Sequence, residues 1–254
     1  TQADAAAAQI FGAISGTTGK LTLTSAQETA AASQTIASYT GTDSDIAIIT
    51  AGDQNHTVIF TGAVTTGAVT GTIVIDGDAG NATATLVQVG GNLTGVVTLD
   101  DNSGAVTLEM TGDSITLGQT VNGVGDGEGI LKLSGTGTTV SSAIGKTGTN
   151  SLAAIDVNGT ATFDGASEAT AYTVDADTTF TGAVLANTSF TVDTAGTDVT
   201  LSAASDLSLA TVTLGTLTAN GLLTTSDLVN TAGKVYLNVK DNEMGAGKIT
   251  LGSG

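Results

Sequence analysis

From about residue 45 onward, the chain is a succession of short β-prone runs separated by Gly, Asn, Asp and Ser. In an extended strand, alternate side chains point to opposite faces. A triplet of a β-branched apolar residue, Thr and Leu therefore places two apolar groups on one face and a hydroxyl on the other. Six such triplets occur: Val97-Thr98-Leu99, Val106-Thr107-Leu108, Ile115-Thr116-Leu117, Val199-Thr200-Leu201, Val212-Thr213-Leu214 and Ile249-Thr250-Leu251.

The spacing of these runs indicates repetition. The first three triplets begin nine residues apart, and Thr173-Val174-Asp175 is echoed eighteen residues later by Thr191-Val192-Asp193. Near-fixed periods with polar turns are typical of stacked units that bury their apolar side against their neighbours. We therefore expect an all-β fold, an irregular β-solenoid of short strands, with one or two β-sandwich domains as the alternative. In the solenoid, six inward side chains form adjacent rungs: Val97, Leu99, Val106, Leu108, Ile115 and Leu117.

The chain of 254 residues contains no Pro. Proline cannot donate a backbone hydrogen bond and is confined to edge strands, strand starts and bulges within sheets. Its absence suits long, uninterrupted ladders of strands.

Residues 1–44 differ from the repetitive body at 45–254 because they are rich in Ala. Ser25 and Glu28 have the spacing of a helix capping box, and the alanines that follow favour helix. This pattern predicts a short helix near residues 26–38, so that residues 1–44 form a helix or an assembly arm. Another edge strand with small residues is the alternative.

Composition argues against catalysis and against several partners. The chain has no Arg, no Cys and one imidazole, His56, and only 3% of its residues are aromatic. The groups that usually carry acid–base chemistry or line a deep pocket are therefore scarce, and we expect no enzyme activity. A net charge of −18 disfavours nucleic acid and anionic lipid surfaces.

Two further features concern location. No apolar run is long enough to form a transmembrane helix, so we expect no membrane insertion. The sequence begins at Thr1 without Met or a charged leader region, which predicts an exported chain with its signal removed, at the cell surface or outside the cell.

Acidic residues two apart suggest calcium as a cofactor. Carboxylate and amide oxygens in a turn can bind Ca²⁺ together with backbone carbonyls. The best candidates are Asp76, Asp78 and Asn81 in one turn and Asp126 and Glu128 in another. Ordinary Asp-rich turns are the alternative reading.

Threonine pairs of the form Thr-x-Thr do not predict an ice-binding face. Ten such pairs occur among 49 Thr, which is no more than the composition explains, and their spacings show no constant rung length.

Lysines gather near the C-terminus. Lys234, Lys240 and Lys248 fall in the last 21 residues, together with Tyr236. We expect the strands at 234–240 and 248–251 to pair with an open sheet edge of another copy, giving a head-to-tail homopolymer or a lattice. A solvated capping strand whose lysines protect its edge is the alternative.

The runs Thr61-Gly62-Ala63-Val64-Thr65, 92–99 and 103–108 resemble those of bacterial autotransporter passengers and surface-layer proteins, of the rickettsial outer-membrane protein B type. The resemblance implies export, a β-rich body and a role as coat or adhesin. We therefore expect a noncatalytic structural subunit that assembles into a surface layer or extracellular filament. The alternative is a cell-surface adhesin that binds glycans or proteins.

Overall fold

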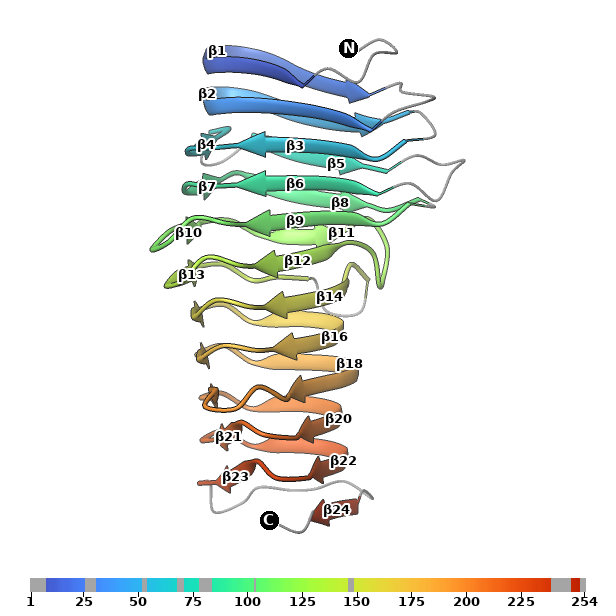
Figure 1. The fold of residues 1–254 in the computed structure, drawn as a ribbon, viewed down its shortest axis with the longest axis vertical. Coiled ribbons are helices and arrows are strands. Elements are labelled where there is room, and N and C mark those ends of the chain that lie inside the picture. The colour runs from blue at the N-terminus through green and yellow to red at the C-terminus, as the bar shows by residue number, and fades with distance from the viewer. Residues whose placement is uncertain are drawn as a thin grey trace.

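The computed structural model describes residues 8–25, 31–51, 54–67, 71–77, 84–102, 104–145 and 149–238, and the backbone of 248–251. This part of the chain is all β, with 24 strands and no helix. Every strand pairing is parallel. The strands stack one above another along the long axis of the molecule, from the N-terminus at one end to the C-terminus at the other (Figure 1). The fold is thus a solenoid-like parallel β-structure, and the β-sandwich alternative, which requires antiparallel sheets, is wrong.

The strands form three series, in which each strand pairs with the next member of the same series. Two long strands, β1 (Gln9–Ser25) and β2 (Ala32–Thr50), pass through all three. The first series is β3 (His56–Phe60), β6 (Thr85–Val89), β9 (Val106–Met110), β12 (Ile130–Leu133), β14 (Leu152–Val157), β16 (Ser167–Val174), β18 (Val184–Val192), β20 (Ser205–Val212), β22 (Leu223–Asn230) and β24 (Lys248–Leu251).

The second and third series complete each circuit of the chain. The second is β4 (Val64–Thr65), β7 (Leu93–Thr94), β10 (Thr116–Leu117), β13 (Thr138–Val140), β15 (Ala161–Phe163), β17 (Thr178–Phe180), β19 (Asp198–Leu201), β21 (Thr216–Ala219) and β23 (Lys234–Leu237). The third is β5 (Thr72–Asp76), β8 (Val96–Asp100) and β11 (Val121–Gly123), and isolated bridges at Ile144 continue it into the start of β16.

The core consists of columns of inward side chains, because parallel pairing in register places equivalent residues directly above one another. One column runs through the first series, and none of its members is more than 2% exposed: Val58, Val87, Leu108, Leu131, Ile155, Tyr172, Phe190, Ala210 and Leu228. Aromatic rings fill its middle, where Tyr172 and Phe190 lie with centroids 5.4 Å apart, and they contact Phe180 of the second series, which stacks on Phe163 at 4.6 Å. Burial of these columns supplies the main driving force for the fold.

The inward positions of the six predicted rung residues are confirmed, but their arrangement as adjacent rungs is wrong. Leu214 of a later triplet is 51% exposed, so the same-face prediction fails there. Val97, Leu108 and Leu117 are buried with the other three predicted residues. However, β8, β9 and β10 follow one another around one circuit, and each pairs with a strand of a neighbouring circuit. The eighteen-residue echo marks the real stacking, since Thr173 pairs with Thr191. Paired residues lie from 17 to 29 positions apart, as for Leu152 with Ala169 and His56 with Thr85.

The predicted helix near residues 26–38 is also wrong. Residues 32–50 form strand β2, and 26–30 lie outside the described residues. Alternate residues of β2 are buried, beginning with Ala32, Gln34 and Ile36, because β2 is hydrogen bonded between β1 and β3. Ladder pairing on both edges outweighs the modest helix propensity of the alanines. The same strand continues across the predicted boundary at residues 44 and 45.

We predict that Val106→Asp strongly destabilises the fold. Val106 is fully buried in β9, so the substitution places a charge inside the stack and should lower the free energy of unfolding by several kcal/mol. The matched control is Thr107→Asp, whose side chain lies on the outer face of the same strand and should cost much less. Denaturant unfolding followed by circular dichroism measures both, and equal losses would contradict the assigned faces.

Candidate functional sites

A buried chain of hydrogen bonds surrounds His56, the only imidazole of the sequence. The His56 side chain is 0% exposed, and its Nε2 lies 3.2 Å from Gln34 Oε1. Because that oxygen only accepts, Nε2 carries the proton and Nδ1 accepts from the Thr50 hydroxyl at 3.4 Å. Thr85 in turn lies 2.5 Å from Thr50, and Gln34 donates to Gln9 of β1 at 3.0 Å. The network therefore joins the first circuits to β1.

Burial lowers the pKa of His56 to about 4. The surrounding groups are Thr hydroxyls and an amide, so the neutral imidazole is satisfied by hydrogen bonds while the charged form is penalised. The sequence pattern did not predict this site, because alternation along the strand alone does not show that the polar residues His56 and Gln34 point into the core.

We predict that acidification weakens the fold through His56. The unfolded chain binds a proton near pH 6.5 and the folded chain only near pH 4. The contribution is therefore intact above pH 6.5 and is lost progressively as the pH falls toward 4, by up to about 3 kcal/mol. The imidazole NMR signals, unambiguous in a chain with one His, should stay neutral at pH 5.5. A variant with His56→Gln should lose this part of the pH dependence, and titration of the native imidazole near pH 6.5 would contradict the prediction.

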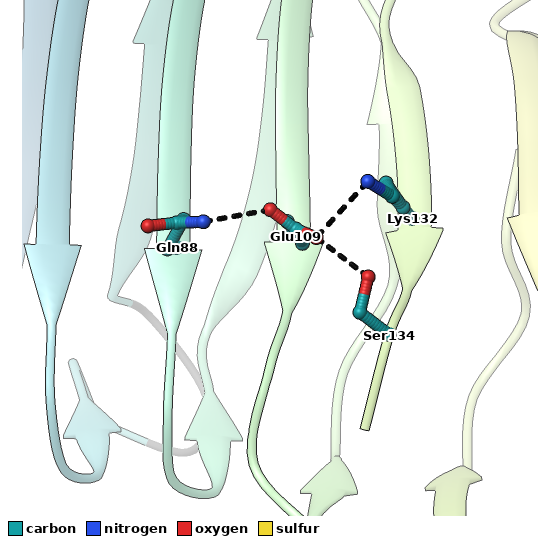
Figure 2. Close-up of polar contacts among 4 residues, drawn as sticks. All are labelled: Gln88, Glu109, Lys132 and Ser134. Carbon is teal, nitrogen blue, oxygen red and sulfur yellow. Dashed lines mark hydrogen bonds and ion pairs between the residues drawn. The ribbon is translucent and has the colours of Figure 1, made fainter. Parts of the chain in front are cut away.

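A second polar network lies on the outer face of the first series (Figure 2). Glu109 of β9 accepts hydrogen bonds from Gln88 of β6 at 2.8 Å and from the Ser134 hydroxyl at 2.5 Å. Lys132 of β12 forms an ion pair with the same carboxylate at 3.2 Å. Burial alone would raise the pKa of Glu109, but these three partners together hold it below its usual value. With every oxygen occupied, Glu109 links three successive strands and is poorly placed for proton transfer.

Acidic side chains gather beyond this network. Asp156 follows Lys132 in the ladder, and burial raises its pKa. Asp175 is partly buried and shares a hydrogen bond with Asp193 of the next circuit, and both effects raise its pKa. The carboxylates that meet are thus equivalents on neighbouring circuits rather than residues two apart in sequence. Among the described residues, no three acidic or imidazole groups are arranged to hold a metal ion.

The predicted calcium ligands fall in separate places. Asp76 ends β5 and accepts from Asn102 Nδ2 at 2.9 Å. Asp78 and Asn81 lie outside the described residues. Asp126 accepts from the Ser151 backbone N–H at 3.1 Å, and Glu128 from the Gly125 N–H at 2.8 Å. Glu128 therefore holds its own turn and Asp126 joins that turn to the next circuit, both through protein donors, and calcium binding stays a prediction.

We predict that millimolar Ca²⁺, compared with a chelator, raises the melting temperature, because an ion that binds only the folded chain stabilises it by mass action. Joint replacement of Asp76 and Asp78 by Asn should remove the shift. The exposed Asp164→Asn variant is the control and should keep it. Identical melting curves with Ca²⁺ and with chelator would end the calcium hypothesis.

The outer face of the second series carries a ladder of threonines that spacing in the sequence conceals. Its members pair one with the next through β10, β13, β15, β17, β19 and β21: Thr116, Thr139, Thr162, Thr179, Thr200 and Thr218. The intervals between them vary from 17 to 23 residues, so unequal spacing does not prevent alignment. A hollow of about 340 Å³ lies on this face and is lined in part by Thr162, Thr179, Asp177 and Asp198.

A second hollow, of about 390 Å³, crosses the starts of β16, β18, β20 and β22. Small residues such as Ala166, Ala183 and Ala204 leave room for it. The carboxylate of Glu168, only 5% exposed, lies in its lining and accepts from Asn187 Nδ2 at 3.3 Å. Both hollows are open surface depressions, and the larger one is also lined by Ser167, Ser205 and Asp206.

The predicted assembly residues lie at the C-terminal end of the stack. Lys234 and Tyr236 belong to β23, where Lys234 is exposed and Tyr236 is 50% exposed. Lys248 begins β24 opposite Asp227 of β22, and Lys240 lies outside the described residues. At the other end, β1 pairs with β2 along one edge, and no other described strand covers its second edge.

No family model matches this chain, and no curated protein or solved structure matches it either. In the part of the chain that the structure describes, there is no helix long and apolar enough to cross a membrane.

Proposed function

We propose that this chain is a noncatalytic β-solenoid that acts as an exported structural subunit and assembles with its own copies into a surface layer or filament. The observation that carries this proposal is the edge of the 17-residue strand β1 that no other described strand covers, together with the parallel ladders whose last described members are β23 and β24. Exposed strand edges are templates for pairing with another chain. The polar networks of the described residues hold strands together, which also fits a structural role.

A second candidate function is adhesion at the cell surface, to glycans or proteins. The threonine ladder and its 340 Å³ hollow favour it, because they present hydroxyl and carboxylate groups in register along one face. Such a face offers many weak hydrogen bonds to a hydroxylated polymer that runs along the stack. The resemblance of the sequence runs to those of autotransporter passengers and surface-layer proteins supports either role.

The test is electron microscopy and light scattering of the purified chain over a range of concentration. We expect fibres or ordered sheets that grow with protein concentration and weaken only partly in salt, since backbone pairing supplies most of the affinity. Isolated short rods at every concentration would exclude self-assembly. Binding of such rods to cell-wall polysaccharide, lost on replacement of Thr179 and Thr200 by bulky residues, would establish the adhesin instead.

A further inference from the structure

We propose that copies of this chain join head to tail in a defined register, in which Ile14 of one copy stacks on Leu237 of the preceding copy. The inference rests on the proposed self-assembly and specifies the surfaces that meet. The surfaces are the free edge of β1 at the N-terminal end and the outer edge of β23 at the C-terminal end.

A single interior column determines which residues of the two copies meet at the junction. It passes through the second series without interruption, each residue paired with the next: Ile14, Tyr39, Val64, Leu93, Leu117, Val140, Phe163, Phe180, Leu201, Ala219 and Leu237. All members between the two ends are buried, whereas Leu237 is 40% exposed. Phe11, at the N-terminal end of the neighbouring column, is likewise 40% exposed. Each end of the stack therefore exposes apolar side chains, and a head-to-tail contact removes them from water.

Backbone geometry allows the junction in the second series. In the first series, the Gln9–Phe11 part of β1 takes the place above β22 that β24 occupies in the single chain. All described strands run parallel, so β1 of the next copy can follow β23 with the same direction and spacing as β23 follows β21. A head-to-head contact would instead require antiparallel pairing between two copies of β1. The parallel geometry thus selects the head-to-tail arrangement.

Charge favours the same orientation. Among the described residues, β1 and β2 at the N-terminal end carry two Asp and one Lys, whereas β23 at the C-terminal end carries one Lys and no acidic side chain. Opposite net charges meet when unlike ends approach, and like charges meet when the N-terminal ends approach each other. A contact between two different surfaces that repeats by translation along the stack does not close, so it produces a filament.

Disulfide trapping tests the register. Because the sequence contains no Cys, the only thiols are those introduced by substitution. Two single variants, Ile14→Cys and Leu237→Cys, are mixed under mild oxidation and separated on a non-reducing gel. Adjacent strands lie about 4.8 Å apart, within the roughly 4.4–6.8 Å between Cα atoms that a disulfide accepts. The mixture should give a covalent dimer with a 14–237 linkage identified by mass spectrometry. A chain that carries both substitutions should give a ladder of covalent multimers.

The control replaces Ile14→Cys by Ile10→Cys, because Ile10 is more accessible, at 79% exposed, but belongs to another column. The 14–237 pair should link at least about tenfold faster than the 10–237 pair, since a disulfide tolerates little displacement. If polymers form but the 14–237 and 10–237 pairs link at equal rates, or if neither pair links, the register is wrong and the proposed function still stands. Wild-type chain that forms no polymer would overturn both.

Discussion

Parallel hydrogen bonding in register is the constraint on which the rest of this molecule depends. Once each strand sits in register on the equivalent strand of the previous circuit, alternation along the strand decides which side chains enter the core. A column contains one residue type over a long stretch only where successive circuits carry that residue at the paired position, as in the outer threonine column of the second series. Core, outer ladders and polar networks are all consequences of one pairing rule.

Local pattern predicted what local geometry determines. The all-β class and the inward faces of Val97, Val106 and Ile115 followed from alternation, which a strand enforces on its own. The stacking period did not follow, because circuits differ in length while pairing residues remain aligned. The nine-residue spacing is the distance along the chain between successive strands of one circuit. The helix prediction failed at β2 because its two neighbouring strands supply hydrogen-bond ladders that an isolated Ala-rich segment lacks.

The candidate sites were also hard to predict, because the sequence does not show which residues of different circuits are paired. Carboxylates chosen two apart in sequence do not act together: Glu128 binds within its own turn, whereas Asp126 binds Ser151 of the next circuit and Asp175 meets Asp193 from the next circuit. The His56 network also draws its members from four strands and the Glu109 cluster from three. Proximity in this fold is set across circuits, so a search along the sequence finds turns and misses clusters.

The strands lie across the long axis of the molecule (Figure 1), and this orientation has a mechanical consequence. Tension along the axis pulls neighbouring strands apart in the direction of their hydrogen bonds, so the bonds at the loaded end break a few at a time. The chain would then peel circuit by circuit and lengthen at a modest, nearly constant force. Cross-links between circuits, such as the ion pair of Lys132 with Glu109, add local resistance to that peeling. A body of this kind yields gradually under load instead of failing at once.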